Sequence, residues 1–287
     1  MSKRTSRNTQ MFALKDGPPP ELAVDGRAYR LKRVFKHDFW AATCLYELAR
    51  PAAGDTLSTI VVKFGRNHPF CGLPIQFYGR WLAVHECGIY ARLAGLAGLP
   101  QCLGMVGQYG IAIEYVDSIP LDHASDIPEG FFDRLRAILD SIHARGVAYC
   151  DANKKSNILI ADCKPVLIDF QISIATRDQW PWPLRQIVAA AVRYMAGKDL
   201  YHLYKHKRKL SDEPLSEHER ALAATPGGFH KLHRKLTKPY RSIRRRFLRS
   251  QHSKGLLASP TEDIEDHYQP EKETWRAANG ERQKEDK

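Results

Sequence analysis

A short apolar run near the middle of the chain ends directly in an aspartate, in Val166-Leu167-Ile168-Asp169-Phe170. A run of this length, preceded by the turn residues 162–165, is typical of a buried strand. A carboxylate at the end of such a strand costs free energy to bury unless a cation or hydrogen-bond donors surround it. We therefore expect Asp169 to lie where it can contact a cation or a donor group.

A second carboxylate and an amide precede this strand. Asp151 follows a helical pattern that ends at Gly146, and Asn157 begins another short apolar strand, 157–160. Carboxylate and amide oxygens are ligands that Mg²⁺ accepts, and a carboxylate can also take the proton of a hydroxyl group. Two carboxylates and an amide on adjacent loops therefore predict a site suited to phosphoryl transfer.

Composition limits the class of protein without identifying a partner. A chain of 287 residues with 43% hydrophobic and 26% charged residues is long enough for one large domain or two closely packed lobes with a buried core. The net charge of +12 favours anionic partners, namely a nucleotide, a nucleic acid, an anionic membrane face or a phosphorylated glycan.

Cysteine spacing and hydropathy favour a cytoplasmic protein. The six cysteines form no C-x-x-C pair, which argues against a zinc–thiolate site and favours reduced thiols. Residues 1–20 lack the apolar stretch of a secretory signal, and the longest apolar run, 187–192, is too short to span a bilayer. We expect the protein in the cytoplasm, with peripheral attachment to the inner membrane face as an option.

Periodicity and turn residues predict an α+β fold in two lobes. Strands are predicted over 59–64 and 110–116, an intervening helix over 82–96, an amphipathic helix over 131–145 and further helices from 183. The predicted divisions are a flexible amino-terminal arm (1–26), a strand-rich lobe (27–116), a helical lobe (117–250) and a disordered charged tail (251–287).

The motif at 149–157, followed by Asp169-Phe170, resembles the protein-kinase catalytic loop H-R-D-x-K-x-x-N and the strand that ends in D-F-G. The likeness covers roughly residues 28–175 and is nearest to compact bacterial kinases, such as lipopolysaccharide core kinases, Kdo kinases and Rio-type kinases. The resemblance implies that Asp151 is the catalytic base and that Asn157, also part of the catalytic loop, binds magnesium together with Asp169. It also implies a shortened helical lobe and a hinge near 117–120.

The amino-terminal half contains residues that resemble the nucleotide-binding parts of the same family. Lys63, in Val61-Val62-Lys63-Phe64, resembles the V-A-I-K lysine that holds the phosphates, and Glu86 resembles the helix glutamate that pairs with it. The segment from Glu114 to Val116 resembles the hinge strand whose backbone bonds adenine. The resemblance therefore implies ATP and Mg²⁺ as cofactors, bound in the cleft between the lobes, and a hydroxyl-bearing acceptor, either a protein or a glycolipid.

The chain also departs from the family pattern. Asn157 follows Asp151 by six steps instead of five, Tyr149 and Cys150 replace the usual histidine and arginine, and Gln171 replaces the glycine of D-F-G. The segment 34–46 has no glycine-rich loop, although Ala41, Ala42 and Thr43 are small enough to substitute in part. These departures keep open a second hypothesis, a pseudokinase that binds nucleotide or a partner without catalysis.

The acceptor side and the carboxy-terminal region leave further alternatives. The interval from Asp169 to the helix near 183 is short and no A-P-E motif follows, which favours a small-molecule, glycan or Rio-like acceptor over a peptide. The segment 231–254 carries ten Lys or Arg and no acid at amphipathic spacing. This pattern suits binding to an anionic membrane leaflet, with RNA as a less favoured partner. Alternatively, it forms a helix that packs on the helical lobe with its basic face in solvent. A membrane-associated scaffold is therefore a third hypothesis.

Overall fold

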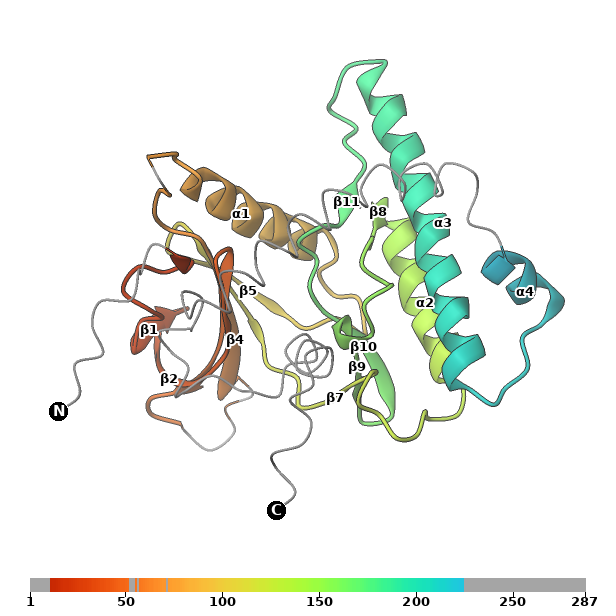
Figure 1. Cartoon of the computed structure of the whole chain (residues 1–287), viewed down its shortest axis with the longest axis horizontal. Coiled ribbons are helices and arrows are strands. Elements are labelled where there is room, and N and C mark those ends of the chain that lie inside the picture. Colours follow the sequence, from red (N-terminus) through yellow and green to blue (C-terminus); the bar gives the residue numbers. More distant parts are fainter. Residues whose placement is uncertain (1–10, 52–54, 56, 71, 225–287) are drawn as a thin grey trace. The chain divides into compact units, whose positions relative to one another are not determined.

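The computed structural model describes residues 11–51, 55, 57–70 and 72–224. These residues form two compact units (Figure 1). We call residues 11–87 and 102–115 the sheet unit, and residues 88–101 and 116–224 the helical unit. The predicted α+β fold class, with a strand-rich first part and a helical second part, is confirmed.

The sheet unit contains one antiparallel sheet in which the strand order is β1-β2-β3-β4-β6-β5. Most of its neighbouring strands follow one another in the chain, so the sheet is largely a meander of hairpins. The strands are β1 (Glu21–Val24), β2 (Arg27–His37), β3 (Ala41–Leu48), β4 (Thr59–Gly65), β5 (Cys102–Val106) and β6 (Gly110–Glu114).

Alternation along β4 decides which side chains enter the core of the sheet unit. Ile60, Val62 and Phe64 are buried and belong to the main apolar cluster, whereas the residues between them are only half-buried. Because successive side chains of a strand point to opposite faces, Lys63 lies on the face away from that cluster. Its neighbours across the sheet are Thr43 on β3 and Ile111 on β6.

The segment 11–24 differs from the flexible arm that the sequence predicted. Phe12, Ala13 and Leu14 are buried, and the amide of Ala13 donates a hydrogen bond of 2.7 Å to the carbonyl of Asp38. The Tyr46 hydroxyl donates to the carbonyl of Pro19, and β1 then extends the sheet. The prolines and glycine at 17–20 suggested flexibility, but the short apolar run before them is stabilised by burial against the sheet.

Helix α1 (Gln76–Arg92) begins six residues earlier than predicted and ends four residues earlier. Its residues up to Cys87 belong to the sheet unit and those from Gly88 to the helical unit. The glycine-rich stretch after it includes Gly95 and Gly98, which both have a positive φ that favours glycine and ends the helix.

The helical unit is built on helices α2 (Phe131–Ala144), α3 (Leu184–Leu210) and α4 (Glu217–Ala224). The amphipathic pattern predicted for α2 is confirmed, because Phe131, Phe132, Leu135, Leu139 and Ile142 are all buried. Short strands complete the unit in two sheets, ordered β10-β9-β7 and β11-β8. They are β7 (Ile119–Pro120), β8 (Val147–Ala148), β9 (Ile158–Ala161), β10 (Lys164–Leu167) and β11 (Ile174–Ala175).

Several sequence predictions fall on residues outside the described part of the chain. They are residues 1–10 of the predicted arm, the basic amphipathic segment 231–254, the charged tail 251–287 and the end of the predicted helical lobe, 225–250. Within the described part, no helix combines the length and the apolar character needed to cross a membrane.

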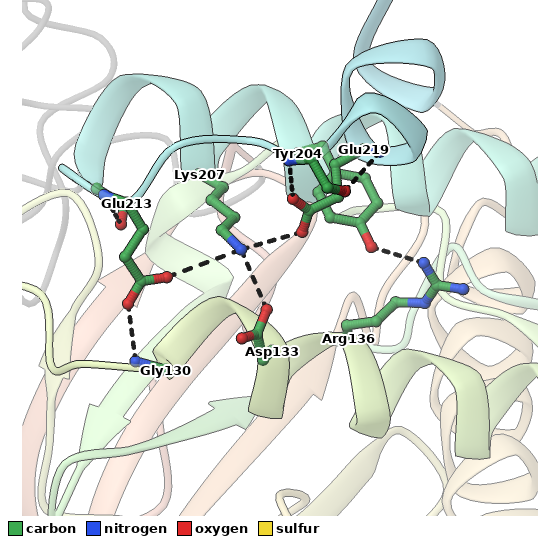
Figure 2. Close-up of polar contacts among 9 residues, drawn as sticks. Gly130, Asp133, Arg136, Tyr204, Lys207, Glu213 and Glu219 are labelled. Atoms are coloured by element: carbon green, nitrogen blue, oxygen red, sulfur yellow. Dashed lines mark hydrogen bonds and ion pairs between the residues drawn. The ribbon is translucent and has the colours of Figure 1, made fainter.

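A buried lysine joins the helices of the helical unit (Figure 2). Lys207 of α3 is 5% exposed, and its Nζ lies 3.1 Å from Asp133 Oδ1 on α2 and 3.0 Å from Glu219 Oε1 on α4. Glu213 lies 3.7 Å from the same Nζ and accepts a hydrogen bond from the amide of Gly130, just before α2. One ammonium group therefore fixes three segments that are far apart in the sequence.

We predict that Lys207→Met lowers the free energy of unfolding by about 2–3 kcal/mol, because the substitution removes charge-assisted hydrogen bonds and leaves Glu219 without its cation. Lys209→Met is the matched control: Lys209 is exposed on the same helix, and we expect a change within about 0.5 kcal/mol. Urea unfolding of the two variants measures both values. Equal stability of the two variants would contradict the structural role of Lys207.

Candidate active site

The loop that carries Asp151 is held by a buried carboxylate from α3. Asp199 is 1% exposed, and its two oxygens accept hydrogen bonds of 2.8 Å from the amides of Tyr149 and Cys150. His143 Nε2 lies 3.1 Å from the same carboxylate. Burial raises the pKa of Asp199 above its ordinary value, although these hydrogen bonds act in the opposite direction.

A second residue of α3 contacts the same loop. His206 is buried, and its Nε2 lies 3.0 Å from the carbonyl oxygen of Ala152, the residue after Asp151. Cys150 has a φ of 68°, in the left-handed region that non-glycine residues seldom adopt. Contacts on both sides of Asp151 thus stabilise a backbone conformation that the loop sequence alone disfavours.

The structure brings Asp151 and Asn157 together. Asn157 Nδ2 donates a hydrogen bond of 2.7 Å to Asp151 Oδ2, and Lys154 Nζ lies 3.7 Å from the same oxygen. The extra residue of the loop is accommodated by a 3-10 turn over Lys155–Asn157, preceded by a hydrogen bond from the Lys154 amide to the Asp151 carbonyl. The longer spacing therefore does not prevent Asn157 from reaching Asp151.

The pKa of Asp151 is raised to about 6. Burial is the largest cause, and the negative charge of Asp169 adds to it, whereas Lys154 and the Asn157 hydrogen bond lower the pKa. The negative charge of Asp169 is thus close enough to disfavour ionisation of Asp151. A cation bound beside them would relieve this repulsion.

Asp169 follows the hairpin of β9 and β10. The hairpin turns at Asp162 and Cys163, which both have positive φ, and pairs Ile158 with Leu167. The amide of Ile168 then donates a hydrogen bond of 3.1 Å to the carbonyl of Asn157. The two predicted strands are confirmed, but the turn is shorter than predicted, because β10 already begins at Lys164. Asn157 and Asp169 lie at the same end of the two paired strands.

The backbone at Asp169 is held by aromatic packing. Asp169 has a φ of 65°, a strained value for a residue with a side chain. Phe170 is fully buried between the rings of Tyr90 and Tyr149, each with a centroid 5.0 Å away, and the Tyr149 hydroxyl donates to the carbonyl of Ile168. Gln171 does not have a positive φ, so the position after Phe170 does not require the glycine of the family pattern.

In the sheet unit the structure brings Lys63 and Glu86 together. Lys63 Nζ lies 2.8 Å from Glu86 Oε1, and the side chains are 12% and 0% exposed. Burial strengthens the Coulomb attraction between these charges, although their desolvation costs free energy. Separating the pair would leave the buried glutamate charge uncompensated, so the glutamate fixes the lysine's position. An ammonium held in this way can bind a phosphate oxygen.

The turn between β2 and β3 differs from the phosphate cradle considered for it. Asp38 Oδ1 accepts hydrogen bonds from the amides of Trp40 (2.8 Å) and Ala41 (2.9 Å). Burial opposes ionisation of Asp38, but Lys36 and these amides outweigh it and lower the pKa. Since the carboxylate already occupies two turn amides, those amides do not bind a phosphate in this conformation.

The two predicted hinge residues fall on either side of the division between the units. Glu114 is the last residue of β6 and is paired with Ile60 of β4. Val116 begins the helical unit, and its carbonyl accepts a hydrogen bond from the Ser118 hydroxyl. Their contact with adenine stays a prediction.

The oxygen donors of the helical unit fit a magnesium ion. The bond to Asp151 uses the nitrogen of the Asn157 amide, so the oxygen of that amide is the atom that a cation would contact. Mg²⁺ is usually held by one or two carboxylates together with substrate phosphates, which matches Asp169 and Asn157. The described residues contain no group of three or more His, Cys, Asp or Glu side chains that could hold a metal ion without such help.

Sequence reasoning missed Asp199. Its signal was present, because Asp199 lies seven residues after Val192 and four before Leu203, and all three are buried on one face of α3. A carboxylate on the buried face of a helix indicates buried donors, but the sequence could not show that these donors are the amides of the Asp151 loop.

The sequence matches no protein-family model and no curated protein. The structure is similar to a crystal structure of the Rio2 kinase from Chaetomium thermophilum, with a TM-score of 0.49 and 16% identity, covering 71% of this chain and 62% of that chain. The ADP/Mg²⁺-phosphoaspartate complex of that kinase gives a TM-score of 0.45 and 16% identity, covering 72% of this chain and 65% of that chain.

This chain spans less than two thirds of the length of either Rio2 structure. Rio-type kinases are among the branches that the sequence resemblance named. The likeness to lipopolysaccharide core and Kdo kinases stays a prediction.

We predict that Asp199→Asn lowers the free energy of unfolding by about 2–3 kcal/mol and frees the loop, because a carboxamide cannot accept both backbone hydrogen bonds. Hydrogen exchange of peptides that cover residues 147–154 should become faster. Asp140→Asn on α2, where the side chain of Asp140 is 51% exposed, is the control and should leave that exchange unchanged. Unaltered loop exchange in Asp199→Asn would contradict the anchoring role.

Proposed function

We propose that this protein is an ATP- and Mg²⁺-dependent phosphotransferase that transfers the γ-phosphate to a hydroxyl group of a protein serine or threonine or of an envelope sugar, such as that of a lipopolysaccharide core. The observation that carries the proposal is the pair of Asp151 and Asn157 beside the charge of Asp169, with a pKa of about 6 for Asp151. A base with this pKa is mostly ionised at neutral pH and still accepts a proton readily.

Asp151 is proposed to orient the acceptor hydroxyl and to take its proton. The acceptor oxygen forms a bond to the γ-phosphorus, and the bond from that phosphorus to the β–γ bridging oxygen breaks. The electron pair of the broken bond leaves with ADP, so the charges and atoms balance. Asn157 holds the Asp151 carboxylate in place through its 2.7 Å hydrogen bond.

Asp169 and the amide oxygen of Asn157 are proposed to hold magnesium. The ion, when bound, would neutralise phosphate charge during transfer. For this chain's own residues, its charge would also offset the mutual repulsion of Asp151 and Asp169, which raises the pKa of Asp151.

Lys63 is proposed to bind the nucleotide's phosphates, with Glu86 fixing the position of its ammonium group. The backbone of Glu114 and Val116 is proposed to bond adenine. Because Asp38 occupies the amides of Trp40 and Ala41, Lys63 would provide a larger share of phosphate binding than in a kinase with a glycine-rich loop.

One observation favours the alternative of a pseudokinase. The Asp38 carboxylate occupies the turn amides where a kinase would bind phosphate, and this negative charge opposes an incoming triphosphate. Measurements of nucleotide binding and of turnover separate the two functions, because a pseudokinase lacks the second.

We predict that ATP raises the melting temperature of the protein in a Mg²⁺-dependent manner, because a ligand that binds only the folded state stabilises it by mass action. Lys63→Met and Asp169→Ala should each abolish most of the shift. Lys32→Met is the matched control, because Lys32 also pairs with a glutamate, Glu47, at 2.9 Å, but the side chains of this pair are about half exposed. Absence of any shift in the wild type would contradict nucleotide binding.

We predict that Asp151→Ala keeps the ATP-dependent thermal shift but reduces turnover by about a hundredfold or more, because only the proton acceptor is lost. Transfer of radiolabelled γ-phosphate to extracted envelope lipids, to lysate proteins or to water measures turnover and identifies the acceptor. If the wild type binds ATP and transfers phosphate to none of these, the pseudokinase is the better account.

We predict that kcat/KM falls as the pH decreases through about 6, because protonation of Asp151 removes the base. Lys154 lowers the pKa of Asp151, so Lys154→Met should raise that pKa and move the acid limb to higher pH. Lys155→Met removes a neighbouring lysine that is not among the main causes of the raised pKa of Asp151, and it should leave the limb nearly in place. An acid limb that is identical in the wild type and Lys154→Met would refute the assignment to Asp151.

A further inference from the structure

The loop before α3 and the first turns of that helix expose five large apolar side chains. Their exposed fractions are 38% for Trp180, 71% for Trp182, 49% for Leu184, 60% for Ile187 and 42% for Tyr194. Every residue from 177 to 187 is exposed. We call residues 177–194 the α3 anchor, and nothing in the proposed phosphotransfer uses them.

The helical part of the α3 anchor forms a continuous stripe. Leu184, Ile187, Ala191 and Tyr194 follow one another at steps of three or four, which places them on one side of the helix over about 15 Å. Figure 1 shows these first turns of α3 extending past the end of α2, its neighbour in the helical unit. The buried residues of α3 begin at Val192.

Cations lie in the loop before this stripe and on the other side of the helix: at ~100° per residue, Arg185 and Arg193 are each roughly 140° from the middle of the stripe. Arg177, Arg185 and Arg193 are exposed. Asp178 is the one acidic residue from 177 to 198. The guanidinium of Arg177 lies 5.4 Å from the ring centroid of Trp180. Lys198 Nζ lies 5.3 Å from the ring centroid of Tyr194, so a cation flanks each end of the apolar surface.

Tryptophan, tyrosine and arginine side by side are the residues that stabilise proteins at the boundary between lipid head groups and acyl chains. The rings have an apolar body and a polar edge, and arginine reaches lipid phosphates while its stem stays in the apolar layer. The positive charge of the α3 anchor, on a chain with a net charge of +12, complements an anionic leaflet.

The same surface is less suited to binding a protein than to binding lipid. A stable protein interface buries about 800 Å² on each side and is depleted of charge at its centre. The α3 anchor includes a projecting helix end (Figure 1), and its apolar residues are interrupted by Arg185 and Arg193. Such an end enters a soft layer of head groups more readily than it matches a rigid surface.

We propose that the α3 anchor binds the surface of an anionic lipid bilayer, with Trp180, Trp182, Leu184 and Ile187 inserted at the head-group boundary. Arg177, Arg185 and Arg193 contact lipid phosphates. The helix lies at or in the interface and does not cross the bilayer. The proposal is independent of phosphotransfer and of the basic segment 231–254, which lies outside the described residues.

Flotation of the full-length chain with vesicles tests the proposal. We expect binding to phosphatidylcholine vesicles that contain about a third phosphatidylglycerol, and much weaker binding to phosphatidylcholine alone, because the cations require anionic lipid. The double substitution Trp180→Ala and Trp182→Ala should weaken binding about tenfold or more. Arg177→Gln with Arg185→Gln should weaken it by about 25-fold, since each cation near an anionic surface contributes about fivefold.

The matched control is Phe77→Ala with Trp81→Ala on α1, because these two aromatic side chains of the sheet unit are also exposed, by 67% and 57%. These changes should leave vesicle binding unaltered. Melting temperatures of all the variants should match the wild type within a few degrees, because each replaced side chain is exposed.

Quenching of tryptophan fluorescence by brominated lipid provides the second readout. We expect quenching in the wild type and in the α1 control, and its loss when Trp180 and Trp182 are replaced. Wild-type binding that survives in the tryptophan variant would overturn the proposal and place attachment elsewhere in the chain. Failure of the wild type to bind anionic vesicles would also overturn it, as would sedimentation showing that the α3 anchor instead joins two copies of the chain.

Discussion

The hydrogen bonds from the Asp151 loop to the buried carboxylate of Asp199 are the interactions on which the candidate active site depends. Two amides and a histidine surround this carboxylate, which offsets the cost of burying it and holds Cys150 in a left-handed conformation. Because Asp151 is the next residue, its direction follows from that conformation. His206 contacts the other side of Asp151, so α3 fixes the loop at both ends.

The β9–β10 hairpin and the edge-to-face aromatic packing at Phe170 supply the second half of the site. They hold Asp169 at a strained φ close enough to Asp151 to raise its pKa, so the folded chain keeps two carboxylates together at a cost in free energy. Structure that is maintained against such a cost is typical of a functional site. The sheet unit has a corresponding feature in Lys63 and Glu86, where a fully buried glutamate is matched by one ammonium group. Lys32 and Glu47 form a similar ion pair, but both side chains are about half exposed, so this pair loses much less contact with water.

The two ends of α3 have different surroundings: polar residues are buried in its later turns, whereas apolar residues are exposed in its first turns. Its middle and carboxy-terminal turns pack in the helical unit and carry Asp199, His206 and Lys207, the buried polar groups that organise the loop and the neighbouring helices. Its first turns carry an apolar stripe on one side and the arginines Arg185 and Arg193 on the other, and this stripe is exposed. An apolar surface of this kind needs a partner of its own, which we infer to be lipid.

The sequence by itself determined the local features of the protein. Strand alternation placed Lys63 opposite the core, the spacing of apolar residues defined α2, and turn residues defined the β9–β10 hairpin, because periodicity and turn chemistry act over a few residues. Contacts between distant segments were decided only by the tertiary structure. The burial of residues 12–14, the hold of Asp199 on the loop 49 and 50 residues earlier, and the use of the Trp40 and Ala41 amides by Asp38 each depend on which faces pack together. A linear pattern shows that a side chain is polar or apolar, but burial and the identity of its partner arise only when the chain has closed on itself.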